Sequence, residues 1–225
     1  MGTNKLIIVG TNPLAEIANE YFTYDSDYDV VAFSLERAFI KPGKYHTFLH
    51  KPLIAFEEIE DLCDTQKHSI FVALGYGHMN DDRTRLYLQA KAMGFNIASY
   101  VSSKAFVWRN VKIGEHCFIF EDNTIQPFVE IGNNVIMWSG NHIGHHTKIG
   151  DNNFLSSHVV VSGQCEIENN CFFGVNSTIA NNLWIGNRCV IGAGANVVND
   201  LQPDGVYVGN PAKRIKNVDE MEEIR

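Results

Sequence analysis

The sequence has no apolar run that approaches the roughly 20 residues a helix needs to cross a bilayer. Its first four residues lead straight into a predicted strand, so we expect no signal peptide. Basic residues are also in deficit. The 18 Lys and Arg residues face 26 Asp and Glu residues, and the net charge of −8 argues against nucleic acid as a partner. We therefore expect a cytoplasmic protein that binds neither membrane nor nucleic acid.

Cysteine is scarce, with five residues, and no two of them have the close spacing typical of a zinc site. Four of the five fall on small inward positions of the repeat described next, where a thiol packs as a compact apolar side chain. Cys63 lies outside the repeat and has no assigned role. Unpaired cysteines also fit a reducing compartment. The four cysteines within the repeat are Cys117, Cys165, Cys171 and Cys189.

A six-residue period dominates the second half of the chain. Every sixth residue from Val107 to Val197 is large and apolar, without a break. At 45% apolar residues, chance would produce such a run about once in a few hundred thousand trials. The residue two positions earlier is mostly small, and the residue just after is often glycine. The repeated positions are Val107, Ile113, Ile119, Ile125, Ile131, Met137, Ile143, Ile149, Leu155, Val161, Ile167, Phe173, Ile179, Ile185, Ile191 and Val197.

This period is typical of a parallel β-helix built as a three-sided prism. Each flat side takes one hexapeptide, so three hexapeptides form a coil of about 18 residues and the whole run forms about five coils. One coil cannot bury its apolar side alone, so the stack is stable only as an array with capped ends. The chain must turn at every corner. We expect Gly and Asn there, because both tolerate the left-handed backbone conformation.

Residues 1–102 are predicted to form an α/β domain. Strands are expected at 5–10, 29–33, 69–74 and 96–100, and helices at 13–24, 56–63 and 81–93. This alternation implies a parallel, Rossmann-like sheet. Residues 34–56 are expected to be irregular, because prolines and a glycine interrupt them. The β-helix domain is assigned to 103–215, with an excursion that begins at 203, and a tail at 216–225 whose end is compatible with a helix.

Ligands on parallel sheets bind beyond the carboxyl ends of the strands. Asn12 can cap the helix that begins at Pro13, and such a helix N-terminus can hold a phosphate. The full G-x-G-x-x-G fingerprint is absent, so a tight strand-to-helix turn is an equal interpretation of Gly10. The residues predicted at this rim of the sheet are Gly10, Thr11, Asn12, Ser34, Gly75 and Tyr76.

Three histidines, His142, His145 and His146, lie close together around the inward Ile143. They face outward or sit at a corner, where packing does not need them. An exposed imidazole suits a general base. A corner that is polar without a function is the alternative, and a metal site is not expected because the spacing favours none. His116 and His158 occupy the same place in their hexapeptides as His146 and are expected to be ordinary surface residues.

The α/β domain, the hexapeptide coils and the closing segment Val-Gly-Asn-Pro-Ala-Lys at 208–213 together resemble the bacterial sugar acyltransferases of the left-handed β-helix superfamily. The most similar branch is the sialic acid O-acetyltransferase-like one. Its best-known relatives N-acetylate nucleotide-linked amino sugars, such as the UDP-4-amino sugar of bacillosamine synthesis. The resemblance covers nearly the whole chain and suggests a role in surface glycan synthesis.

The resemblance implies a homotrimer with active sites between adjacent β-helices, acetyl-CoA along the coils and a nucleotide-linked amino sugar at the rim residues. His145, ahead of Ile149 and Gly150, would be the general base, and Val175 and Ala193 would contact CoA. No metal is implied. The chain departs from the family at His146, where relatives often carry an acidic residue, so His142 or His146 could share the work of the base. Phe154 replaces a second family histidine, and the glycine-rich Gly-x-x-Gly-His opening is missing.

The reaction we predict is direct attack of the sugar amine on acetyl-CoA. Two alternatives stay open, an O-acetyltransferase on a sugar hydroxyl and a non-catalytic trimer that binds sugar nucleotides. A hydroxyl is the poorer nucleophile and needs the base and its orienting group more. The missing acidic neighbour therefore slightly favours an amine as the acceptor.

Overall fold

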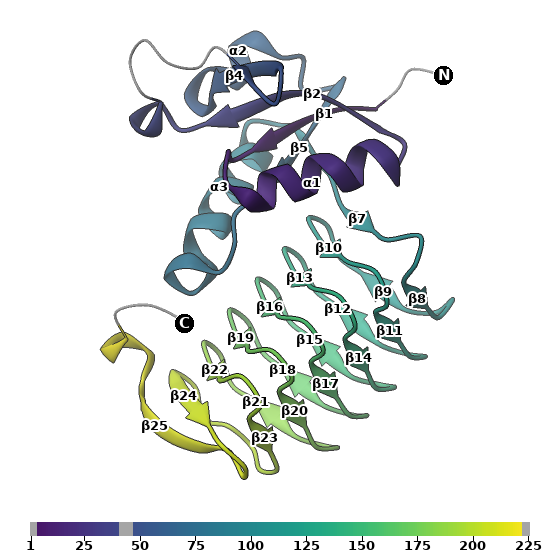
Figure 1. Cartoon of the computed structure of the whole chain (residues 1–225), viewed down its shortest axis with the longest axis vertical. Coiled ribbons are helices and arrows are strands. Elements are labelled where there is room, and N and C mark those ends of the chain that lie inside the picture. Colours follow the sequence, from purple (N-terminus) through teal and green to yellow (C-terminus); the bar gives the residue numbers. More distant parts are fainter. Residues whose placement is uncertain (1–3, 41–46, 222–225) are drawn as a thin grey trace. The chain divides into compact units, whose positions relative to one another are not determined.

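The computed structural model describes residues 4–40 and 47–221 (Figure 1). The chain divides into two compact units. The first comprises Met1–Gly75 and Asp82–Tyr100, and the second comprises Tyr76–Asp81 and Val101–Arg225. The second unit thus includes a short loop that interrupts the first in sequence.

The first unit contains a six-stranded sheet in the order β3-β4-β2-β1-β5-β6. All of its neighbouring strands pair in parallel, except for the antiparallel pair β3 and β4. The strands are β1 Asn4–Val9, β2 Tyr28–Leu35, β3 Thr47–Phe48, β4 Lys51–Ala55, β5 His68–Val72 and β6 Asn96–Ile97. The helices are α1 Pro13–Tyr24, α2 Ile59–Leu62 and α3 Asp81–Ala92, with short 3-10 turns at Arg37–Phe39, Phe56–Glu58 and Gly77–Asn80.

Helices cover both sides of this sheet. Ile70 and Val72 of β5 share a buried cluster with Leu86 of α3. Phe71, between them, points to the opposite side, where its ring lies 5.2 Å from that of Phe22 in α1. Alternate residues of one strand therefore meet different helices, as expected of a buried parallel strand. The predicted α/β fold with a parallel sheet is confirmed.

The prediction that residues 34–56 are irregular is wrong for 47–55. Thr47–Phe48 and Lys51–Ala55 form a hairpin whose two connecting residues, Leu49 and His50, both have positive φ, at 47° and 62°. Such two-residue turns normally contain Asn or Gly, so the sequence shows no turn signal here. Pro52 is tolerated because the pairing of β4 with β2 begins one residue later, at Leu53. Pro42 and Gly43 lie outside the described residues.

The predicted strand at 96–100 is two separate strands. β6, Asn96–Ile97, is the edge strand of the first unit's sheet, next to β5. β7, Tyr100–Val101, belongs to a different sheet, the longest of the coils. The boundary between the two units falls within β7.

The second unit is a parallel β-helix with three sheets, and each of its coils contributes one two-residue strand to each sheet (Figure 1). Ile119, Met137 and Leu155 show the register, because they pair in succession at intervals of 18 residues. The first sheet contains β10 Phe118–Ile119, β13 Ile136–Met137, β16 Phe154–Leu155, β19 Phe172–Phe173 and β22 Val190–Ile191. The second contains β8 Phe106–Val107, β11 Thr124–Ile125, β14 His142–Ile143, β17 Val160–Val161, β20 Thr178–Ile179 and β23 Asn196–Val197. The third contains β9 Lys112–Ile113, β12 Glu130–Ile131, β15 Lys148–Ile149, β18 Glu166–Ile167 and β21 Trp184–Ile185.

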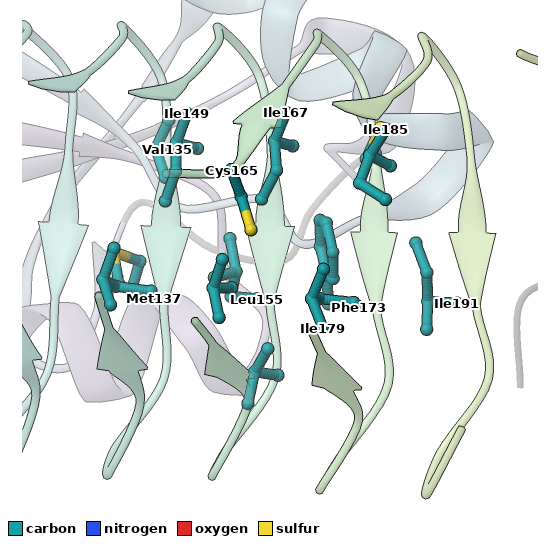
Figure 2. Close-up of a cluster of buried hydrophobic side chains, with 14 of the residues drawn as sticks. Val135, Met137, Ile149, Leu155, Cys165, Ile167, Phe173, Ile179, Ile185 and Ile191 are labelled. Carbon is teal, nitrogen blue, oxygen red and sulfur yellow. The ribbon is translucent and has the colours of Figure 1, made fainter. Parts of the chain in front are cut away.

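The core of the β-helix lies on its axis, where side chains from all three sheets meet (Figure 2). The large positions of the repeat from Ile119 onward are buried, and Val107 and Ile113 in the first coil are partly buried. The four predicted inward cysteines are also buried. Inward asparagines donate their side-chain N–H groups to carbonyls of the coils. The Asn123 amide, for example, donates to the carbonyls of Phe120 and Trp138, both at 2.9 Å.

The corners recur with the six-residue period, but the expectation that glycine takes the left-handed positions holds only in part. From His116 to Gly194, the residue three positions after each inward residue has positive φ. Asn takes many of these corners as predicted, at Asn134, Asn152, Asn170, Asn176 and Asn182.

The glycines directly after inward residues do not have positive φ, so the prediction that they allow a left-handed turn was wrong. Gly144 shows why glycine is needed at this position. A Cβ on Gly144 would lie 2.4 Å from the backbone nitrogen of Gly163, one coil further on. These glycines allow successive coils to approach each other closely, which a methyl group would prevent.

After the last coil, the chain forms a hairpin from β24, Gly205–Val208, and β25, Lys213–Asn217. β24 pairs in parallel with β22 and so covers the end of the first sheet. The predicted tail helix is only a 3-10 turn, Val218–Glu220, within the described residues. Among the helices that the structure describes, none has the length and apolar character required to cross a membrane.

Candidate functional site

The histidine cluster forms a corner of the β-helix after β14. Ile143 points inward, and His146 adopts the left-handed conformation, with φ of 60°. The coils on both sides hold the backbone of His145. Its N–H donates to Oε1 of Gln126 at 2.9 Å, and its carbonyl accepts from the Gln164 N–H at 2.8 Å. The position of His145 on the edge of the prism is therefore determined by three successive coils.

The two corner imidazoles contact each other. Nδ1 of His145 lies 3.1 Å from Nδ1 of His146, and the rings are nearly perpendicular, with centroids 5.3 Å apart. The His146 ring also stacks on Phe128, with centroids 4.6 Å apart and an interplanar angle of 25°. Both histidines are exposed. The arrangement is an oriented imidazole pair that solutes can reach.

Three supporting residues were not found from the sequence: Gln126, Phe128 and Gly163. A Cβ on Gly163 would lie 2.9 Å from both Cε1 and Nε2 of His145, so a larger residue there would force that ring to shift. Phe128 precedes His146 by one coil, and Gly163 follows His145 by one coil. The 18-residue spacing is therefore the signal that could have identified both.

His142 and His158 lie apart from this pair in the coil pattern. His142 belongs to β14, on a flat side, where it pairs with Thr124 and Val160 of the adjacent coils. His158 is at another corner, with φ of 59°, and its ring lies against Gly140, where a Cβ would be 2.5 Å from Nδ1 of His158. The structure thus brings together His145 and His146 of the sequence-predicted cluster.

The two predicted CoA contacts, Val175 and Ala193, are neighbours on adjacent coils. The N–H of Gly194 donates to the Val175 carbonyl at 2.8 Å, and Val175 is 45% exposed. They lie at the corner that carries His158, because the residues directly after them, Asn176 and Gly194, follow His158 at intervals of 18. Within one chain this corner is a different edge of the prism from the His145 corner.

The first four predicted rim residues are adjacent in the first unit. The Gly10 N–H donates to the Ser34 carbonyl at 2.8 Å. Gly10 has φ of 128°, and a Cβ there would lie 3.0 Å from the Ala73 carbonyl oxygen, so the turn itself requires glycine. Ser34 is fully buried, and its hydroxyl has no hydrogen-bond partner among the described residues. Thr11 follows Gly10 and is half-buried.

Asn12 has a structural task. Its Oδ1 accepts from the Ala15 N–H at 3.0 Å and caps α1, and its Nδ2 donates to the Ala73 carbonyl at 3.1 Å. Gly75 follows β5, and its carbonyl accepts from Nη1 of the buried Arg83 at 2.6 Å. Both polar groups of the Asn12 side chain thus have hydrogen-bond partners, whereas the Ser34 hydroxyl has none among the described residues.

Tyr76 belongs to the second unit and not to the group around Gly10. Its ring lies 4.9 Å from Phe154 and 4.6 Å from Phe172, measured between centroids. Phe154 and Phe172 stack in turn on adjacent coils. Phe154 is therefore part of an aromatic cluster. The family resemblance placed it where relatives carry a histidine.

No metal centre is evident in the described part of the chain. No group of three His, Cys, Asp or Glu side chains there is arranged to hold a metal ion. Burial raises the pKa of the Cys165 thiol, which disfavours the thiolate that a nucleophile needs. The exposed imidazole pair is the feature best suited to proton transfer.

The family model for the bacterial transferase hexapeptide, six repeats, matches residues 110–145 and 164–199. Both matched ranges lie within the coils. No curated protein matches the chain by sequence.

Solved structures match over nearly the whole chain. The acetyltransferase domain of PglB from Neisseria gonorrhoeae is 20% identical, with a TM-score of 0.83 over 94% of this chain and 100% of that one. A histidine-to-asparagine variant of perosamine N-acetyltransferase from Caulobacter crescentus, in complex with CoA and GDP-perosamine, is 21% identical, with a TM-score of 0.81 over 95% and 97%. WeeI from Acinetobacter baumannii is 17% identical, with a TM-score of 0.61 over 93% and 99%. At these identities the likeness establishes the shared fold, an α/β domain followed by a left-handed β-helix.

Proposed function

We propose that the protein is an acetyl-CoA-dependent N-acetyltransferase that acts on the amino group of a nucleotide-linked deoxysugar. The observation that carries the proposal is the exposed His145–His146 pair on an edge of a hexapeptide β-helix. Similar chains named as acetyltransferases support it, and one of them binds both CoA and GDP-perosamine.

The chemistry we propose is a direct transfer. The neutral amine attacks the thioester carbonyl, and Nε2 of His145 takes the proton that the nitrogen loses as it becomes an amide. The C–S bond breaks, and the CoA thiolate takes that proton from Nε2. Holding both substrates in one cleft adds to the rate, because oriented reactants gain a high effective concentration. No acyl-enzyme is required, in keeping with the burial of Cys117, Cys165, Cys171 and Cys189.

In the first unit, we propose that the sugar nucleotide binds at the carboxyl ends of β1, β2 and β5. Gly10, Thr11 and Gly75 would offer backbone groups there, the buried Ser34 would support the turn through its carbonyl bond to the Gly10 N–H, and Asn12 would act mainly by capping α1. Tyr76 belongs to the aromatic cluster of the second unit and is not part of this proposed group.

Coupled thiol release tests the reaction class. The protein is incubated with acetyl-CoA and a panel of nucleotide-linked 3-amino and 4-amino deoxysugars, each paired with its hydroxyl counterpart. We expect CoA release with one amino sugar and none with its hydroxyl partner. Turnover on the hydroxyl partner alone would replace the proposal with O-acetylation. Silence across the panel without acetyl-CoA binding would reject the transferase.

We further propose that the active form is a homotrimer in which the Val175–Ala193 edge of one subunit faces the His145 edge of the next. This follows from the separation of those edges within one chain. Co-expression of His145→Ala with Val175→Trp tests it. Each variant alone is expected to be inactive, and random mixed trimers are expected to regain about a quarter of the wild-type activity, because that share of interfaces pairs two intact edges. A mixture no more active than its parts would contradict the shared site.

A further inference from the structure

The contact between the two imidazoles restricts where their protons lie. A neutral imidazole carries one N–H and one bare nitrogen. Two Nδ1 atoms 3.1 Å apart form a hydrogen bond only when one of them carries the proton. If His145 carries it, Nε2 of His145 is bare and can act as a base. If His146 carries it, Nε2 of His145 is protonated and cannot.

We propose that His146 is the positioning residue of His145: its bare Nδ1 accepts a hydrogen bond from Nδ1–H of His145 and thereby keeps Nε2 of His145 unprotonated. The inference rests on the proposed function and names how its base is prepared. His146 is suited to accept because its own ring is held. Its backbone N–H donates to the Pro127 carbonyl at 3.2 Å, and its ring stacks on Phe128. The acceptor therefore stays in place without a partner of opposite charge.

The residues known to contact the pair are uncharged. Among the described residues, its hydrogen bonds and ring contacts come from Gln126, Pro127, Phe128 and Gln164, and Gly163 lies against the His145 ring. None of these titrates. Lys148 is the nearest charged residue in sequence, and it lies on the following flat side, in β15. His145 thus works beside a neutral acceptor, where a carboxylate would hold its protonated form more tightly.

The proton balance closes on this arrangement. Nε2 of His145 takes the amine proton while Nδ1–H remains bonded to His146, and Nε2 then gives that proton to the CoA thiolate. Neither ring gains or loses a proton over the cycle. A proton added to His146 beforehand occupies its Nδ1, removes the acceptor and stops the cycle. One extra proton on either ring therefore inactivates the pair.

Three substitutions at His146 separate positioning from a structural role. Asn and Asp both occur at other left-handed corners, at Asn152 and Asp122, and both present an oxygen at the place of Nδ1. We expect His146→Asn to retain kcat within about threefold, because Oδ1 still accepts the hydrogen bond from Nδ1–H of His145. His146→Asp should also turn over, with the acid limb of its pH–rate profile moved to higher pH, because the carboxylate favours protonated His145. His146→Phe retains an aromatic ring beside Phe128 but no acceptor, and its kcat should fall about 10- to 100-fold at unchanged KM values.

Ring ¹⁵N shifts of the free protein give a readout that does not depend on turnover. We expect His145 in the Nδ1–H form in the wild type, in His146→Asn and in His146→Asp, and in the Nε2–H form in His146→Phe. The proposal is overturned if the tautomer of His145 is the same in all four proteins, or if the three variants lose activity equally. An inactive wild type with the expected tautomers would reject the proposed reaction and leave the positioning intact.

Discussion

Replacing His145 with alanine is expected to lower kcat by about 10²- to 10⁴-fold, which is the usual contribution of a general base. The fold should not change. His145 is exposed, and its backbone φ is not in the left-handed region, so alanine introduces no strain and leaves no cavity. Its backbone bonds to Gln126 and Gln164 do not need the imidazole. The measurement is kcat and KM for acetyl-CoA and for the amino sugar identified by the panel.

His145→Gln is the matched control for this substitution. Glutamine restores side-chain bulk beside Gly163 but cannot take a proton at neutral pH. Both variants should therefore lose kcat to the same extent, with circular dichroism and oligomeric state unchanged. Turnover near the wild-type level in either variant would remove His145 from the base role. Recovery in His145→Gln alone would show that packing against Gly163 matters and proton transfer does not.

Periodicity predicted the second unit well because it repeats one physical constraint. Each coil must bury one large and one small side chain, so positions such as Ile143 and Cys165 are readable from spacing. The same period places residues 18 apart on top of each other. The 18-residue spacing could therefore also have predicted the stacking of His146 on Phe128 and the space that Gly163 gives to His145. Contacts along the coil axis were predictable in principle, although only those in the core were predicted from the sequence.

Other features depend on contacts that no local pattern reports. The β3–β4 hairpin turns at Leu49 and His50, two residues with no preference for positive φ, so their conformation comes from the pairing of the flanking strands. Asn12 caps α1, as its place before Pro13 predicted, but nothing in the local sequence indicated that its amide also donates to the Ala73 carbonyl. The residue just after each inward position suggested a flexible corner, although Gly144 is there for the close approach of Gly163.

Replacing Phe173 with alanine is expected to cost about 3–5 kcal/mol of stability, the usual range for a buried phenylalanine. Phe173 is fully buried on the axis of the β-helix, paired with Leu155 before it and Ile191 after it (Figure 2). Its ring is the one aromatic side chain among the large inward positions of the repeat. Alanine would leave a cavity between two coils, and the regular backbone could not collapse to fill it. Hydrogen exchange by mass spectrometry, with a urea titration, measures the loss.

The location of the lost hydrogen-exchange protection tests the architecture, in addition to the amount of stability lost. In a stack of coils, stability is approximately a sum of coil terms and neighbour contacts, so a cavity should loosen its own neighbourhood first. We expect Phe173→Ala to lose protection in β16, β19 and β22, while β1 and β5 of the first unit keep theirs. Val198→Ala is the control, since Val198 is 45% exposed and its truncation should change stability by no more than about 0.5 kcal/mol. Equal loss of protection in both units would mean that the chain unfolds cooperatively as a whole. The stability of each coil would then not depend mainly on its adjacent coils, which would contradict this prediction.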